Sequence, residues 1–203
     1  MDGTLVDSTA VVENTWAVWA KRNDIPLPEL LAYSHGRPTL DTMNRFKPGI
    51  DWHEDARQLL TLEENQAEGT IPIPGVKELL ASLPAERWAV VTSAPRKLAE
   101  LRIQAAGLPL PRVLVPVDEI EQGKPHPEGY LKAARLLNFP ADECVVFEDT
   151  RPGIEAGLNA GMDVVGLLTT MTAERLGCDF VIRDYHDLEV LALDGKYQIR
   201  MRQ

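Results

Sequence analysis

The chain has 203 residues, of which 44% are hydrophobic and 26% are charged, a composition typical of globular proteins. This length allows one domain with a large insertion, or two small domains. The formal net charge of −10 argues against nucleic acid or an anionic membrane as a partner, because both favour clustered Lys and Arg. We find no stretch as long and apolar as a membrane span and no signal-peptide pattern.

The two cysteines, Cys144 and Cys178, lie far apart and outside any Cys-x-x-Cys pair. We therefore expect no structural disulfide, and this cysteine usage fits a reducing compartment. The sequence predicts a cytoplasmic protein on this basis.

The first predicted elements are helices. Ser8 is expected to cap a helix that runs to about Asn23, because apolar residues from Val12 to Ala20 share one face. Further helices are predicted at residues 29–33, 39–46 and 53–68, and Pro48-Gly49 separates the last two. This region contains no convincing strand pattern.

The pattern changes after the Pro- and Gly-rich stretch at residues 71–75. Short apolar runs at 88–91, 113–115, 144–147, 164–168 and 180–182 alternate with helical segments. Alternation of this kind predicts an α/β fold in which helices cover both faces of a parallel sheet. We assign residues 1–10 and 70–203 to this core and residues 11–69 to an inserted helical cap. A β-hairpin is predicted at 191–201, around Asp194-Gly195.

Polar side chains collect where the predicted strands end. Thr92-Ser93 ends one apolar run, Glu148-Asp149 ends another, and Lys124 follows a third after a loop. Asp2-Gly3-Thr4 has the composition of a further loop at a strand end. In an open parallel sheet, ligands bind beyond the carboxyl ends of the strands, so we expect these groups to share one edge.

These side chains favour one kind of chemistry. Three carboxylates at one site repel one another unless a cation lies among them, and oxygen ligands beside a phosphate favour Mg²⁺. The hydroxyl groups and the Lys124 ammonium complement phosphoryl oxygens. The sequence therefore predicts Mg²⁺-dependent phosphoryl transfer.

Taken in this order, the four motifs resemble the haloacid dehalogenase-like hydrolases, in the helical-cap branch of sugar phosphatases and β-phosphoglucomutases. Each motif alone is weak, but all four occur in order, each at a predicted strand end, with a helical insertion after the first. The resemblance extends from Met1 to about Leu191. It implies a Rossmann-like parallel sheet with an inserted α-helical cap.

The resemblance assigns a role to each matching residue. Asp2 matches the family's general acid and base, and its backbone carbonyl would bind Mg²⁺. Thr92 and the Ser93 backbone N–H match the phosphoryl-binding groups. Lys124 matches the cation that neutralises the nucleophile and the phosphate. The metal ligands would be Asp149 and Glu148, the latter directly or through water.

The family's first motif is Asp-x-Asp-Gly-Thr, and its nucleophilic first Asp would come directly before Met1. The sequence contains neither this Asp nor the apolar strand that carries it. The resemblance implies that this strand is central, so its absence would divide the sheet and expose two edges. We expect the natural protein to be longer; the alternative is a truncated, catalytically inactive chain.

In the cap, His35-Gly36-Arg37 suggests a tight turn from which Arg37 reaches a substrate phosphate or hydroxyl. The alternative is a surface turn with an exposed arginine.

The expected function is hydrolysis of a small phosphate monoester, a sugar or polyol phosphate, through an aspartyl-phosphate intermediate. The cap would close over the substrate and exclude bulk water. Two alternatives remain open: a phosphomutase with the same core, and a non-catalytic protein that binds a phosphate ligand. The expected partner is a small phosphorylated metabolite, and the expected state is a monomer or weak dimer.

Overall fold

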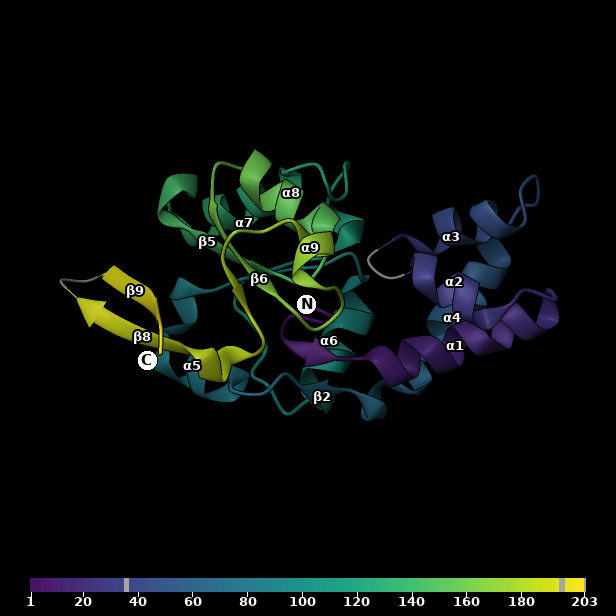
Figure 1. Ribbon diagram of the computed structural model, residues 1–203, viewed down its shortest axis with the longest axis horizontal. Helices are drawn as coiled ribbons and strands as arrows, with labels where there is room; N and C mark the ends of the chain where they lie inside the picture. The colour runs from purple at the N-terminus through teal and green to yellow at the C-terminus, as the bar shows by residue number, and fades with distance from the viewer. Residues whose placement is uncertain (35–36, 194–195, 203) are drawn as a thin grey trace.

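The computed structural model describes residues 1–34, 37–193 and 196–202. Its helices are α1 (Thr9–Arg22), α2 (Leu27–Ser34), α3 (Thr39–Phe46), α4 (His53–Asn65), α5 (Val76–Ser82), α6 (Arg96–Ala105), α7 (Glu128–Leu137), α8 (Arg151–Asn159) and α9 (Ala173–Leu176). Its strands are β1 (Val6–Asp7), β2 (Ile71–Pro72), β3 (Val90–Val91), β4 (Leu114–Val115), β5 (Val145–Glu148), β6 (Asp163–Leu167), β7 (Val181–Ile182), β8 (Leu188–Leu193) and β9 (Lys196–Met201). Figure 1 shows their arrangement.

The five short strands β3 to β7 are all parallel, which confirms the predicted α/β fold. Among the described residues they form two sheets, β3–β4 and β5–β6–β7. β1 pairs antiparallel with β2. β8 and β9 form an antiparallel hairpin, and its predicted turn, Asp194-Gly195, lies outside the described residues.

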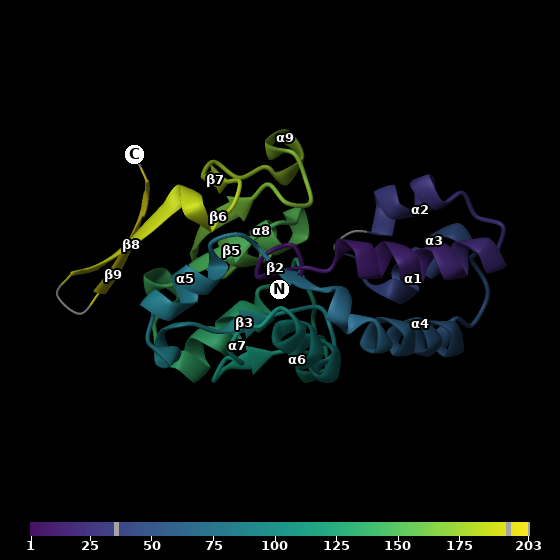
Figure 2. The same cartoon turned by 90° about the horizontal axis from the view of Figure 1, so that it is seen from below.

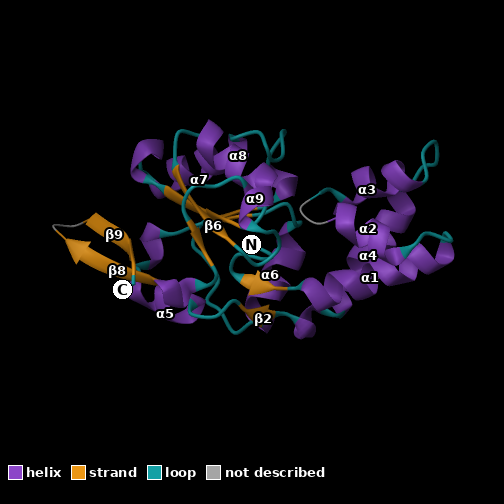
Figure 3. Cartoon of the chain, viewed as in Figure 1, coloured by secondary structure: helices purple, strands orange, loops and turns teal. Residues whose placement is uncertain are grey.

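Helices cover both faces of the parallel strands (Figure 3). Along β5 and β6, successive side chains point to opposite faces, as strand geometry requires. Val146 and Val164 belong to the cluster that includes α7 and α8, whereas Phe147 and Val165 belong to the cluster that includes α5 and α6. Burial on both faces explains why these strands read as continuous apolar runs.

Helices α1 to α4 lie together, to one side of the sheets (Figures 1 and 2). They have a hydrophobic cluster of their own, built around three tryptophans. Trp19 is 1% exposed, and its ring makes edge-on contacts with Trp16 and Trp52, with centroids 5.7 and 5.3 Å apart. Edge-on aromatic pairs add to the stabilisation from burial. The division at residues 11–69 stays a prediction.

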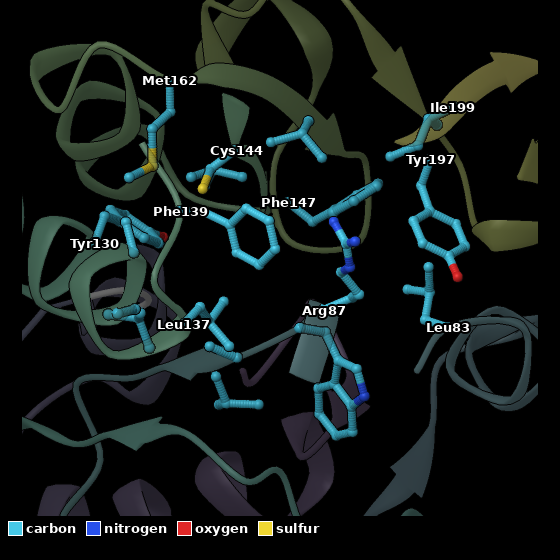
Figure 4. A pocket seen from close by; sticks show the side chains of 18 of the residues that line it. Leu83, Arg87, Tyr130, Leu137, Phe139, Cys144, Phe147, Met162, Tyr197 and Ile199 are labelled. Carbon is cyan, nitrogen blue, oxygen red and sulfur yellow. The ribbon is translucent and has the colours of Figure 1, made fainter. Parts of the chain in front are cut away.

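A largely apolar cavity of about 450 Å³ lies beside both parallel sheets (Figure 4). Val90 and Val91 of β3 line it, as do Val146 and Phe147 of β5. Met1 lines it as well. Among the described residues, β3 pairs only with β4 and β5 only with β6. Each sheet therefore has a strand with an unpaired edge beside this cavity.

In the part of the chain that the structure describes, the helices lack the combination of length and apolar composition that a membrane crossing requires.

Candidate active site

The N-terminal loop is a tight turn that lies against the end of β5. The Met1 carbonyl accepts hydrogen bonds from the backbone N–H groups of Thr4, Leu5 and Val6, at 3.1, 2.7 and 3.2 Å. Gly3 has a φ of +67°, and a Cβ at this position would lie 2.0 Å from Oδ2 of Asp149. Both the left-handed backbone and this close approach require glycine. The sequence thus brings residues 2–4 directly onto Asp149.

Asp149 is a buried carboxylate held by hydroxyl groups. Thr4 Oγ1 donates to its Oδ1 at 2.8 Å, and Thr170 Oγ1 donates to its Oδ2 at 2.6 Å. The residue is 4% exposed. Burial, together with the neighbouring charge of Glu148, raises the pKa of Asp149 to about 6. The Asp149 carboxyl group therefore ionises less readily than an exposed aspartate does.

Glu148, by contrast, is paired with a cation. Lys124 Nζ contacts its Oε1, and Tyr130 donates its hydroxyl to the same oxygen at 2.6 Å. Thr150 Oγ1 donates to Oε2 at 3.1 Å. Although burial opposes ionisation, the Lys124 ammonium holds the pKa of Glu148 below its usual range. A Cβ on Gly153 would lie 2.0 Å from this carboxyl group, so glycine is needed here too.

Thr92 and Ser93 follow β3, as predicted. Thr92 is buried; its N–H donates to the Val115 carbonyl at 3.0 Å, and its Oγ1 accepts from the Ala94 N–H at 3.1 Å. Ser93 is exposed. Their role in binding a phosphoryl group stays a prediction.

The Asp2 carboxylate has two partners, and neither was predicted. Its Oδ1 accepts from Ser8 Oγ at 2.7 Å and from Nη1 of Arg102 at 3.0 Å. Ser8 occupies the N-cap position of α1, as predicted, and its carbonyl accepts from the Val12 N–H at 3.0 Å, but its side chain makes no capping bond. A hydroxyl donor prefers the charged carboxylate as its acceptor. The Asp2 side chain is 32% exposed. It is therefore accessible to solvent although Ser8 and Arg102 fix its position.

Arg37 lies on a cleft of about 750 Å³ that it shares with residues of the α/β core, including Arg151 and Thr170. Its guanidinium lies 4.4 Å from the ring centroid of Tyr33. Because Thr170 also contacts Asp149, the cleft extends from Arg37 toward the buried carboxylates. His35 and Gly36 of the same motif lie outside the described residues.

Two of the predicted metal ligands, Glu148 and Asp149, are adjacent and buried. Within residues 1–34, 37–193 and 196–202, no group of three or more His, Cys, Asp and Glu residues is arranged to hold a metal ion. The donors nevertheless fit Mg²⁺, because they are hard oxygens. The pKa of Asp149 is raised by burial and by the neighbouring charge of Glu148, and a bound cation would offset both effects. The contribution of Asp2 as a ligand stays a prediction.

The sequence did not predict several residues at the site, among them Thr170, Tyr130 and Arg102. Thr170 follows β6, and the strand-end reasoning used for the other runs would have found it if extended to this one. Tyr130 and Arg102 lie within helices α7 and α6, where a lone tyrosine or arginine carries no motif.

Comparison with known proteins agrees with this geometry. The profile of the haloacid dehalogenase-like hydrolases matches residues 1–161. The chain belongs to this family. Membership in the haloacid dehalogenase-like hydrolases confirms the resemblance inferred from the four motifs and identifies the chain as a hydrolase.

Individual relatives cover most of the chain. Hexitol phosphatase A of Escherichia coli is 37% identical over 95% of this chain and 91% of its own length. Glycerol-1-phosphate phosphohydrolase 2 of Saccharomyces cerevisiae is 32% identical over 94% of this chain and 82% of its own length. The crystal structure of a hydrolase from Pseudomonas syringae superimposes with a TM-score of 0.78 and 26% identity, covering 92% of each chain.

Proposed function

We propose that this protein is a Mg²⁺-dependent phosphatase that hydrolyses a small phosphate monoester, a sugar or polyol phosphate. The observation that carries the proposal is the contact of the Asp2-Gly3-Thr4 turn with the buried Asp149 carboxylate, next to the Lys124–Glu148 pair. The names of two similar proteins, a hexitol phosphatase and a glycerol-1-phosphate phosphohydrolase, support this substrate class.

In this proposal each residue of the site has a defined role. Asp2 protonates the leaving alkoxide and then accepts a proton from the attacking water. Thr92 and Ser93 bind the phosphoryl oxygens, and Lys124 balances their charge. Asp149, Glu148 and the Asp2 carbonyl would hold Mg²⁺, which would neutralise charge on the phosphoryl group.

The aspartyl-phosphate route also needs a nucleophilic carboxylate. The cavity beside β3 and β5 supports one position for it, because both strands have an unpaired edge there and Met1 lies at the wall. A parallel strand seated in this cavity would pair with both sheets. We place the nucleophile at the end of such a strand, directly before Met1 and beside Asp2.

We assign residues 11–69 to a cap and Arg37 to substrate binding. The cleft that Arg37 shares with Arg151 and Thr170 supports this assignment, since it leads from α2 toward Asp149. Closure of helices α1 to α4 over this cleft would exclude bulk water from the reacting phosphate.

Phosphate release from a panel of sugar and polyol phosphates tests the function. The chain is assayed as it stands and with an N-terminal extension of about six apolar residues that ends in Asp before Met1. The matched control ends in Asn. We expect Mg²⁺-dependent release only with the Asp extension. Equal release by the Asn control would overturn the position of the nucleophile, and no release from any substrate would overturn the function.

A further inference from the structure

A buried arginine joins the α/β core to the helices of the cap. Arg102 lies on α6 and is 3% exposed. Its Nη1 bonds to Asp2 Oδ1 at 3.0 Å, and its Nη2 bonds to Glu63 Oε2, on α4, at 2.8 Å. One guanidinium thus connects the N-terminal turn of the site to α4, the last α-helix within residues 11–69.

Burial of this cation is costly and needs a reason. Removing an arginine from water is offset only when good partners satisfy its donors. In the described part of the chain, Nε of Arg102 has no hydrogen-bond partner, so Asp2 and Glu63 provide the compensation. The planar guanidinium can donate hydrogen bonds to two carboxylates in fixed directions, which a lysine ammonium cannot do. The arrangement is therefore specific to arginine.

The same Asp2 oxygen is also tied to the start of the cap region. Ser8, which bonds to Asp2 Oδ1 at 2.7 Å, directly precedes α1. Glu63 lies in the last turn of α4, shortly before the chain returns to β2. Asp2 is thus connected to both segments where the chain passes between the core and the helices α1 to α4. It bonds directly to Ser8 before α1, and Arg102 links it to Glu63 at the end of α4.

We propose that Arg102 is a positioning residue that couples the placement of the cap to the placement of the Asp2 carboxylate. With α4 packed against α6, Nη2 of Arg102 bonds to Glu63 and Nη1 bonds to Asp2, which Ser8 also holds. When α4 moves away, Arg102 loses Glu63 and keeps Asp2 as its carboxylate partner. The inference rests on the proposed function only in treating Asp2 as the acid and base.

A neighbouring ion pair provides a matched control. Lys97 and Glu64 join the same two helices, but the Lys97 side chain is 73% exposed. It does not contact Asp2 in the described structure. The Glu64 side chain is 16% exposed, but the Lys97 ammonium is open to solvent, which screens the pair and keeps its contribution to stability small. The variants Lys97→Met and Glu64→Gln therefore perturb the α4–α6 contact without changing the Arg102 connection.

Amide hydrogen exchange on the whole chain tests the coupling without activity. We expect Glu63→Gln and Arg102→Lys each to speed exchange at residues 8–12 and 70 by about fivefold, and the double variant to add nothing further. In the controls Lys97→Met and Glu64→Gln, the exchange rates at these residues should stay within about twofold of those in the parent protein. Additive effects, or equal effects from Lys97→Met and Glu64→Gln, would overturn the inference. Arg102→Lys keeps a positive charge beside Glu63. A faster exchange in this variant is therefore not caused by a buried Glu63 carboxylate left without a cation.

Steady-state kinetics of the chain carrying the Asp extension adds a second readout. Glu63→Gln should lower kcat by about fivefold and change KM by no more than about twofold. When Glu63→Gln is made in the Arg102→Lys background, it should cause no further fall in kcat. A change in KM alone would overturn a positioning role. If no substrate is turned over, the proposed function fails, and the exchange experiment still decides the role of Arg102.

Discussion

Thr4 Oγ1 donates a 2.8 Å hydrogen bond to Asp149 Oδ1 across 145 residues of sequence. Both residues are buried, and the bond joins the N-terminal turn to the end of β5. We expect Thr4→Val, which keeps the shape but removes the donor, to lower the free energy of unfolding by about 1–3 kcal/mol. Thr4→Ser keeps the hydroxyl and is the control. Urea denaturation measures both, and equal losses would show that the hydroxyl is not the cause.

Gly3 provides a second test of the same contact. A Cβ there would lie 2.0 Å from Asp149 Oδ2, whereas a Cβ on Gly49 would meet nothing within 4 Å. Both glycines have positive φ, so Gly49→Ala reports the backbone strain alone, about 1–2 kcal/mol. We expect Gly3→Ala to cost clearly more, measured as the shift in urea midpoint. Similar costs would mean that Asp149 can move away without penalty.

Asp149 makes stability depend on pH in a defined direction. Its pKa is raised in the folded protein from 3.8 to about 6, so the folded state binds this proton more tightly than the unfolded state does. The contribution is complete below pH 3.8 and is lost as the pH rises through 6, a loss of about 3 kcal/mol. In Asp149→Asn this loss should be absent.

Magnesium should reverse this loss in the parent protein. At pH 7 we expect Mg²⁺ to raise the Tm of the parent and to leave Asp149→Asn unchanged, because a ligand stabilises only the state that binds it. Differential scanning calorimetry with and without the ion measures both effects. A Tm rise of equal size in Asp149→Asn would remove Asp149 from the metal site.

Lys124 should matter for folding as well as for phosphate. Glu148 is 2% exposed and depends on the Lys124 ammonium. Lys124→Met leaves a buried carboxylate without its cation and should cost about 3–5 kcal/mol. Lys124→Met combined with Glu148→Gln should recover part of this loss. Lys132→Met, which removes a cation from the partly exposed pair with Glu119, is the control and should have a much smaller effect in the same urea experiment.

The sequence predicted those features that local pattern determines. Alternating apolar runs located all five parallel strands, and the sequence correctly placed Thr92-Ser93 after β3 and Glu148-Asp149 at the end of β5. It did not predict Arg102, because a charged residue on an amphipathic helix is usually solvated, and its burial depends on Asp2 and Glu63 meeting in space. Ser8 was correctly placed at the N-cap of α1, but the sequence did not show that its hydroxyl bonds to the Asp2 carboxylate instead of to a backbone N–H of the helix.

The most direct test of the account is the turnover of Asp2→Asn in the chain that carries the Asp extension. Phosphate release from hexitol and glycerol phosphates would be measured with Mg²⁺ and with the ion chelated. We expect Asp2→Asn to lower kcat by about 10²- to 10⁴-fold, while the fold and the Mg²⁺-dependent rise in Tm are kept. Unchanged Mg²⁺-dependent turnover in Asp2→Asn would contradict the central claim that Asp2 is the acid and base of a phosphatase site.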